Sequence, residues 1–268
     1  MMGTCTVQGR TIGFERIGAG PPLVVINGYA ATKADWDPTF TAALGEDREL
    51  IRIDNRGVGV SNDDGGQFTI EDLSADVAGV LAQLEIVRPP LLGWSMGGSV
   101  ALALAIGRPD LVGKLVLLAT TPGGDAGTRP AESAKARLLD LSGTPREQAT
   151  RLISLLFTED RAAEVDAEFG EIVASARAEL SPETLQRQAA AMEEWQAGPG
   201  ADLAAVSCPT LIATGSEDVV IPPANAVALA TGIADAWLAR FPGCGHGFMA
   251  DHPKSLSRLI ATFLSVRT

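Results

Sequence analysis

The sequence has few of the residues on which small secreted and metal-binding proteins depend. It contains only three cysteines and two histidines in 268 residues. The cysteines, Cys5, Cys208 and Cys244, are odd in number and widely spaced, which gives neither a disulfide framework nor a Cys-x-x-Cys metal knuckle. No cluster of His, Cys and carboxylate residues has the spacing of metal ligands. We therefore expect no bound metal.

Positive charge and long apolar runs are scarce as well. The 21 Lys and Arg residues are outnumbered by 33 Asp and Glu residues, which gives a net charge of −12. Nucleic acid and anionic membrane surfaces are poor partners for such a chain. The apolar runs are too short to span a membrane, and the first ten residues lack the pattern of a signal peptide. We expect a cytoplasmic protein.

Apolar residues, in contrast, make up 46% of the chain, enough for a large core. Short apolar runs predict strands at residues 5–7, 12–16, 23–26, 49–54, 89–94, 113–120, 209–215 and 236–243. Helical patterns follow several of them, at residues 69–84, 96–107, 222–232 and 252–264. This alternation predicts an α/β fold with a mostly parallel, doubly wound sheet of eight strands.

One long region interrupts the alternation. Residues 121–203 contain no convincing strand but carry helical patterns, the last of which begins with Ser181 as N-cap and Pro182 as the first helical residue. We expect a helical cap at 121–203 that lies as a lid over one edge of the sheet. The core domain would then comprise residues 1–120 and 204–268.

A serine lies between glycines where a predicted strand meets a predicted helix. Residues 93–97, Gly-Trp-Ser-Met-Gly, fit the pattern Gly-x-Ser-x-Gly. A sharp turn at this place forces the serine into a strained backbone conformation and requires small neighbours. It also lifts the hydroxyl above the carboxyl edge of the sheet, where ligands bind in such folds. We interpret Ser95 as a nucleophile.

A serine hydroxyl needs a base, and the chain offers two candidates. His246 lies in a glycine-rich loop after the last predicted strand, from which it could reach over the sheet edge. His252 precedes the final helix and fits a surface or capping residue better. We therefore assign the base to His246.

The base in turn needs an acid that fixes its tautomer. Asp218 follows the strand that ends at Gly215, so that Ser95, Asp218 and His246 each follow a predicted strand. Asp125, after the 113–120 strand, is an alternative acid. We favour Asp218 because the order Ser, Asp, His is that of α/β-hydrolases.

A developing oxyanion requires preorganised donors. We expect these to be the backbone N–H groups of Met96 and Tyr29. The substrate pocket is expected to include one residue beside the nucleophile and several from the cap. These residues are Trp94, Leu152, Leu156, Met192 and Trp195.

With these residues in place, the sequence resembles the α/β-hydrolase family in its lidded esterase, lactonase and haloperoxidase-like branch. The resemblance rests on five segments, "NGYAATKADW", "IRIDNRGVGVSN", "LLGWSMGGSVALALA", "LIATGSEDVVIPP" and "FPGCGHGF". It implies structural roles for Asp54 and Arg56. The chain departs from the family at Asn27, where a histidine is usual. Because the oxyanion donor is a backbone group, the hole is preserved if Asn27 makes the local hydrogen bonds of that histidine.

The resulting hypothesis is a cofactor-free serine hydrolase that cleaves a carboxylic ester or lactone of a small, mainly apolar substrate through an acyl-enzyme on Ser95. One alternative is a cofactor-free haloperoxidase or perhydrolase, which uses the same residues. The other is a ligand receptor of the same fold that turns over slowly.

Overall fold

The centre of the molecule is a single sheet. The computed structural model describes residues 1–266. Eight strands pair in the order β1-β2-β4-β3-β5-β6-β7-β8. Their bounds are β1 Met2–Val7, β2 Arg10–Gly18, β3 Pro22–Ile26, β4 Glu49–Ile53, β5 Pro90–Trp94, β6 Lys114–Leu118, β7 Thr210–Gly215 and β8 Trp237–Phe241. β1 pairs antiparallel with β2, and β2 pairs antiparallel with β4, whereas the six strands from β4 to β8 in the sheet order are parallel. The predicted fold class is thus confirmed.

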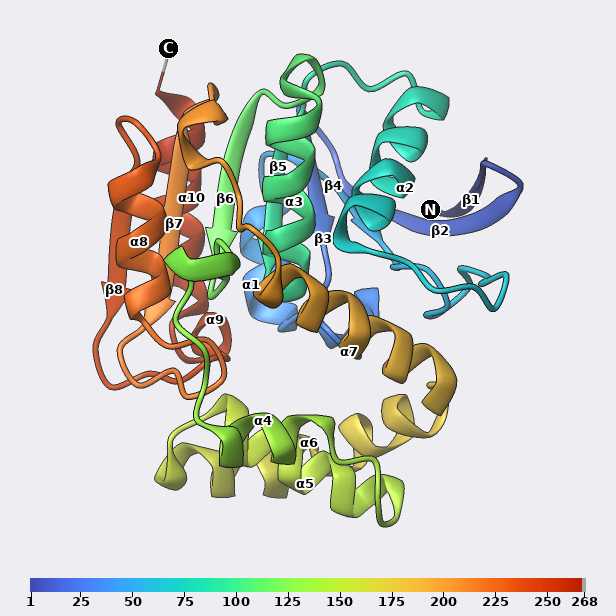
Figure 1. The fold of residues 1–268 in the computed structure, drawn as a ribbon, viewed down its shortest axis with the longest axis vertical. Helices are drawn as coiled ribbons and strands as arrows, with labels where there is room; N and C mark the ends of the chain where they lie inside the picture. The colour runs from blue at the N-terminus through green and yellow to red at the C-terminus, as the bar shows by residue number, and fades with distance from the viewer. Residues whose placement is uncertain (267–268) are drawn as a thin grey trace.

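Helices cover both faces of the sheet, because successive side chains of each strand point to opposite faces. In β3, Val24 and Ile26 belong to the core under α2 (Ile70–Gln83), α3 (Met96–Gly107) and α8 (Ala224–Gly232). Leu23 and Val25 belong to the core under the other three helices. These are α1 (Pro38–Leu44), α9 (Phe248–Asp251) and α10 (Pro253–Ser265). Figure 1 shows α2 and α3 in front of the sheet and α1 and α10 behind it.

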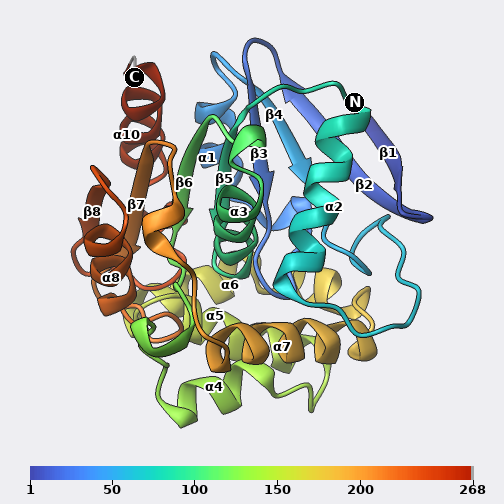
Figure 2. The same cartoon turned by 45° about the horizontal axis from the view of Figure 1, so that its top comes forward.

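The long segment between β6 and β7 is helical. It contains α4 (Glu132–Leu139), α5 (Pro145–Leu156), α6 (Glu159–Ala178) and α7 (Pro182–Ala197), which we call the cap helices. Figure 1 shows α7 next to the carboxyl ends of the strands, with α4, α5 and α6 as a further layer below it, and Figure 2 shows the same helices at that end of the sheet from another side. This arrangement supports a division of the chain into a core and a cap.

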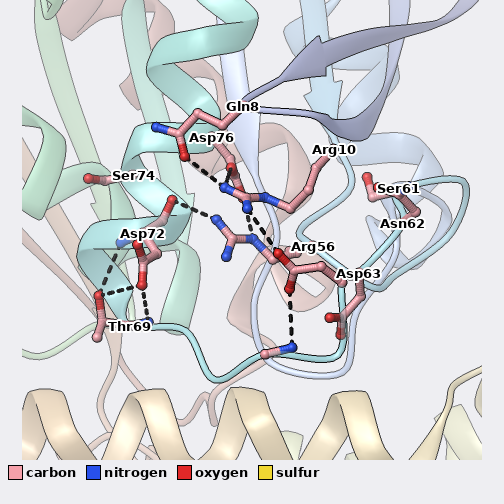
Figure 3. Close-up of polar contacts among 12 residues, drawn as sticks. Gln8, Arg10, Arg56, Ser61, Asn62, Asp63, Thr69, Asp72, Ser74 and Asp76 are labelled. Carbon is pink, nitrogen blue, oxygen red and sulfur yellow. Dashed lines mark hydrogen bonds and ion pairs between the residues drawn. The ribbon is translucent and has the colours of Figure 1, made fainter.

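The turn after β4 is fixed by buried charges. Asp54 is fully buried, accepts a hydrogen bond from the Lys33 amide at 2.9 Å and also contacts the Lys33 ammonium. Arg56 donates from Nε to Asp76 of α2 at 2.8 Å, and Figure 3 shows both side chains within a larger polar cluster. These contacts fit the structural roles that the resemblance implied for Asp54 and Arg56.

The first turn of α3 packs against backbone. A Cβ atom added to Gly97 would lie 2.3 Å from the Ile26 carbonyl oxygen, and one added to Gly93 would lie 2.2 Å from the Gly97 oxygen. Neither contact can be relieved by a side-chain movement. The glycines on both sides of Ser95 are therefore required by the close approach of β3, β5 and α3.

We expect Gly97→Ala to lower the free energy of unfolding by about 3 kcal/mol or more, because the added methyl group overpacks a rigid site. Urea unfolding measures the effect. The matched control is Gly107→Ala at the end of the same helix, where an added Cβ meets nothing within 4 Å. Equal stability of the two variants would contradict the steric argument.

Candidate active site

Ser95 lies in the turn between β5 and α3, with its backbone in an unusual conformation. Its φ of 56° and ψ of −123° are strained for a residue other than glycine. The neighbouring chain holds this conformation, since the Ser95 amide donates to Leu118 at 2.9 Å and the Thr120 hydroxyl donates to the Ser95 carbonyl at 2.7 Å. The side chain faces a cavity and is 9% exposed.

His246 and Asp218 form a buried pair beyond β8 and β7. The His246 Nδ1 atom lies 2.7 Å from Asp218 Oδ2. The other oxygen, Asp218 Oδ1, accepts hydrogen bonds from the amides of Val220 at 2.9 Å and Ile221 at 2.8 Å. An ionised carboxylate can only accept, so with Asp218 ionised the donor of this contact is His246 Nδ1. This arrangement suits a histidine that acts as a base through Nε2.

Trp94 connects this pair to the serine turn. Its indole N–H donates to the His246 carbonyl at 3.3 Å, and its ring centroid lies 5.3 Å from that of the imidazole. Ser95 and His246 line the same cavity, although they are far apart in the sequence. The structure thus brings Ser95 and the His246–Asp218 pair to one place.

The alternative residues lie elsewhere. Asp125 is exposed in the 3₁₀ turn Gly124–Ala126, and His252 contacts the Phe241 ring at a centroid distance of 5.5 Å. Neither residue lines the cavity. Asp218, and not Asp125, is the carboxylate that contacts His246.

The loop after β3 passes directly over the serine. A Cβ atom added to Gly28 would lie 3.2 Å from the Ser95 Cβ. The next residue is Tyr29, and within residues 1–266 the amides of Tyr29 and Met96 have no protein acceptor. Two backbone N–H groups beside Ser95 are therefore free to donate to a ligand.

Asn27 holds this loop in place. Its side-chain amide is fully buried, donates to the Ile53 carbonyl at 3.1 Å and accepts from the Trp36 indole. The Asn27 carbonyl accepts from Asn55 at 2.9 Å. Asn27 thus makes buried hydrogen bonds of the kind expected of a residue that replaces the usual histidine.

The cavity has a volume of about 350 Å³ and mostly apolar walls. The cap contributes Leu152, Leu156 and Met192 to these walls, and Trp94 lies beside Ser95. The expectation for Trp195 needs correction, because its indole donates to the Thr121 carbonyl at 3.3 Å and packs against the core under α3. Val220 and Ile221 also line the cavity, and no sequence pattern predicted this. Met249 could have been suspected from its position three residues after His246.

The basic side chains that line the cavity are all paired. Arg129 and Lys135 contact Glu193 at 2.8 and 2.5 Å. Arg161 contacts Glu164 at 2.8 Å and Asp251 at 3.1 Å. Arg129 and Lys135 share the single carboxylate of Glu193, so these three side chains together carry one net positive charge.

Two other ionisable groups of the wall are affected by burial. Desolvation raises the pKa of the Asp35 carboxyl, against the opposing hydrogen bonds from Thr32. Desolvation likewise raises the pKa of the Tyr29 phenol, against the opposing charge of Arg177. Both shifts make the charged forms of these two side chains less favourable.

In residues 1–266 we find no group of three or more His, Cys, Asp or Glu side chains placed to hold a metal ion. No described helix is both long and apolar enough to cross a bilayer.

The chain is similar to known proteins over most of its length. The model of the alpha/beta hydrolase family matches residues 23–259. The 2-hydroxymuconate semialdehyde hydrolase of Pseudomonas sp. (strain CF600) is 32% identical over 260 residues, which cover 92% of this chain and 88% of that protein. Among solved structures, a hydrolase from Pseudomonas aeruginosa PA01 is 25% identical with a TM-score of 0.85, covering 99% of this chain and 98% of that one. The enol-lactonase from Burkholderia xenovorans LB400 also has a TM-score of 0.85, at 24% identity, and covers 98% of this chain and 100% of its own.

Proposed function

Because the chain belongs to the alpha/beta hydrolase family, we propose that it hydrolyses a carboxylic ester or lactone of a small, mainly apolar substrate through an acyl-enzyme on Ser95. The observation that carries the proposal is the 2.7 Å contact between His246 Nδ1 and Asp218, with Ser95 and His246 on one cavity. The strained Ser95 backbone adds support, since such strain accumulates at functional sites.

In this proposal His246 Nε2 takes the Ser95 proton as the hydroxyl oxygen attacks the substrate carbonyl. The carbonyl oxygen gains negative charge and accepts hydrogen bonds from the amides of Tyr29 and Met96. His246 then protonates the leaving alkoxide, and the acyl group remains on Ser95. A water molecule, deprotonated by His246, releases the acid and restores the serine. Asp218 keeps Nδ1 protonated and stabilises the imidazolium throughout.

The cavity wall supports a neutral substrate. Leu152, Leu156 and Met192 offer apolar contact, while the basic residues of the wall are paired with carboxylates. A cavity of about 350 Å³ is at the small end of the range for ligand pockets. We therefore propose a small neutral ester or lactone without a free carboxylate.

A second candidate is hydrolysis of a substrate such as 2-hydroxymuconate semialdehyde, favoured by the relative that is 32% identical. Such a substrate carries a carboxylate, as its name states. A buried carboxylate requires a charged or hydrogen-bonding partner. The mostly apolar walls of the cavity make this candidate the weaker one.

The test compares neutral p-nitrophenyl esters and lactones of graded size with 2-hydroxymuconate semialdehyde. We expect kcat/KM for the best neutral ester to exceed that for the semialdehyde at least about tenfold, since an unpaired buried carboxylate costs well over 1 kcal/mol. The reverse preference would establish the second candidate. No turnover of any ester or lactone would overturn the proposed function.

A further inference from the structure

A glutamine of the cap reaches the loop that lies over Ser95. Gln188, on α7, is fully buried, and its Oε1 atom accepts a hydrogen bond from the Ala30 amide at 3.0 Å. The two residues are 158 positions apart in the sequence. Ala30 directly follows Tyr29, whose amide is the proposed oxyanion donor. A cap side chain is therefore bonded one residue away from that donor.

The bonded residue has a backbone conformation that needs support. Ala30 has a φ of 55°, in the left-handed region that L-residues with a side chain rarely adopt. Such a conformation persists only where the surroundings enforce it. On the other side of Tyr29, Asn27 is held by Ile53, Trp36 and Asn55. The Tyr29 amide thus lies between two anchors, of which Gln188 is the one supplied by the cap.

The helix that carries Gln188, α7, packs against loops of the core. Thr184, Arg187 and Gln188 lie on one helix face, because residues three and four apart are neighbours. Arg187 donates from Nε to Asp63 at 3.0 Å, and a Cβ added to Gly57 would lie 2.7 Å from the Thr184 side chain. Two further contacts between α7 and core loops therefore lie within about one helical turn of the bond to Ala30.

Apart from the bond to Ala30, the Gln188 side chain makes no hydrogen bond within the described residues. Within the described chain its Nε2 atom is buried and has no partner. A glutamine that served only to fill space could be replaced by an apolar residue without that unsatisfied group. The hydrogen bond that Gln188 Oε1 accepts from the Ala30 amide therefore explains why a polar residue occupies this buried position.

We propose that Gln188 is a positioning residue that holds the Tyr29 amide in the direction of the developing oxyanion, so that α7 completes the oxyanion hole from the cap. The inference rests on the proposed function. A donor stabilises the transition state only if it points at the place where charge develops. Without the acceptor at Ala30, the loop loses one of its two anchors, and the donor loses its alignment.

The test is Gln188→Leu, which introduces an apolar side chain of similar size and removes the acceptor. For the best neutral ester we expect kcat to fall about 10- to 100-fold while KM stays within about threefold, because a misaligned donor weakens the transition state more than the ground state. The dissociation constant of a trifluoromethyl ketone, which forms an oxyanion on Ser95, should rise by the same factor. Hydrogen exchange of the Ala30 amide should become faster.

The matched control is Arg187→Met on the same helix, which removes the ion pair with Asp63 but leaves the bond to Ala30. Its kcat should stay within about twofold of the parent even if its melting temperature falls as much as that of the glutamine variant. Should Gln188→Leu fold poorly, Gln188→Asn serves instead. Its side chain is shorter by one methylene group, so its carbonyl oxygen no longer reaches the Ala30 amide, and we expect kcat to fall in the same way.

Two results overturn the inference alone: an unchanged kcat in the folded Gln188 variant, or an equal loss in Arg187→Met. Failure of the proposed function is distinguishable from both, because the unmodified protein would then show no ester turnover at all.

Discussion

Replacing Ser95 with alanine is expected to lower kcat for neutral esters by about 10⁵-fold or more, since the residues of a catalytic serine constellation act as a unit and loss of the nucleophile removes the covalent route. The Ser95→Ala protein should also fail to react with a fluorophosphonate probe. Initial rates with p-nitrophenyl esters and mass spectrometry of the labelled protein measure the two effects. The His246–Asp218 contact does not involve Ser95 and should survive the change.

Ser99→Ala is the control for this experiment. Ser99 lies one turn further along α3, is also buried and contacts the Thr120 hydroxyl at 3.3 Å. Its removal costs a hydrogen bond of about 1 kcal/mol in stability and should leave labelling and turnover unchanged. Undiminished turnover in Ser95→Ala would refute the assignment of the nucleophile.

Asp218→Asn is expected to lower kcat by about 10⁴-fold, close to 5.5 kcal/mol of transition-state stabilisation. The amides of Val220 and Ile221 fix the orientation of the side chain, because they require an oxygen at the Oδ1 position. The asparagine NH₂ group would then face His246 Nδ1 and force that atom to accept. Nε2 would carry the proton and could not take one from Ser95.

The structure offers Asp125→Asn as the matched substitution, because Asp125 is the alternative acid considered from the sequence and is exposed outside the cavity. Its kcat should stay within about twofold of the parent. Melting temperatures of both variants separate a loss of activity from a loss of fold. A larger loss in Asp125→Asn than in Asp218→Asn would reverse the choice of acid.

The sheet and the relation of Ser95, Asp218 and His246 could be predicted because their signals are local. Each strand is a short apolar run, and each of the three residues follows such a run at a turn. The helix α1 escaped prediction because seven residues are too few to show a period. The helix α4 escaped because it is short and none of its residues is buried, so that its sequence carries little apolar periodicity.

Residues of α7 show where sequence patterns stop being informative. Met192 and Trp195 share the apolar character expected of a pocket wall, yet only Met192 lines the cavity. Gln188 is polar, but it is fully buried against a residue 158 positions away. What decides these outcomes is the angle at which α7 crosses the core. That angle depends on contacts between distant segments, such as the close approach of Thr184 to Gly57.

The insertion of the cap helices between β6 and β7 has a consequence for the order in which the chain folds. β7 pairs with β6 only after about ninety intervening residues have been enclosed, and closing an unstructured loop of that length costs about 4 kcal/mol of entropy. Pairing at such sequence separation is slow. The serine turn can form once β1 to β6 have assembled, whereas Asp218 and His246 arrive with the last two strands. During synthesis the chain therefore acquires its proposed nucleophile first and the base that activates it last, which keeps incomplete chains from carrying an active serine.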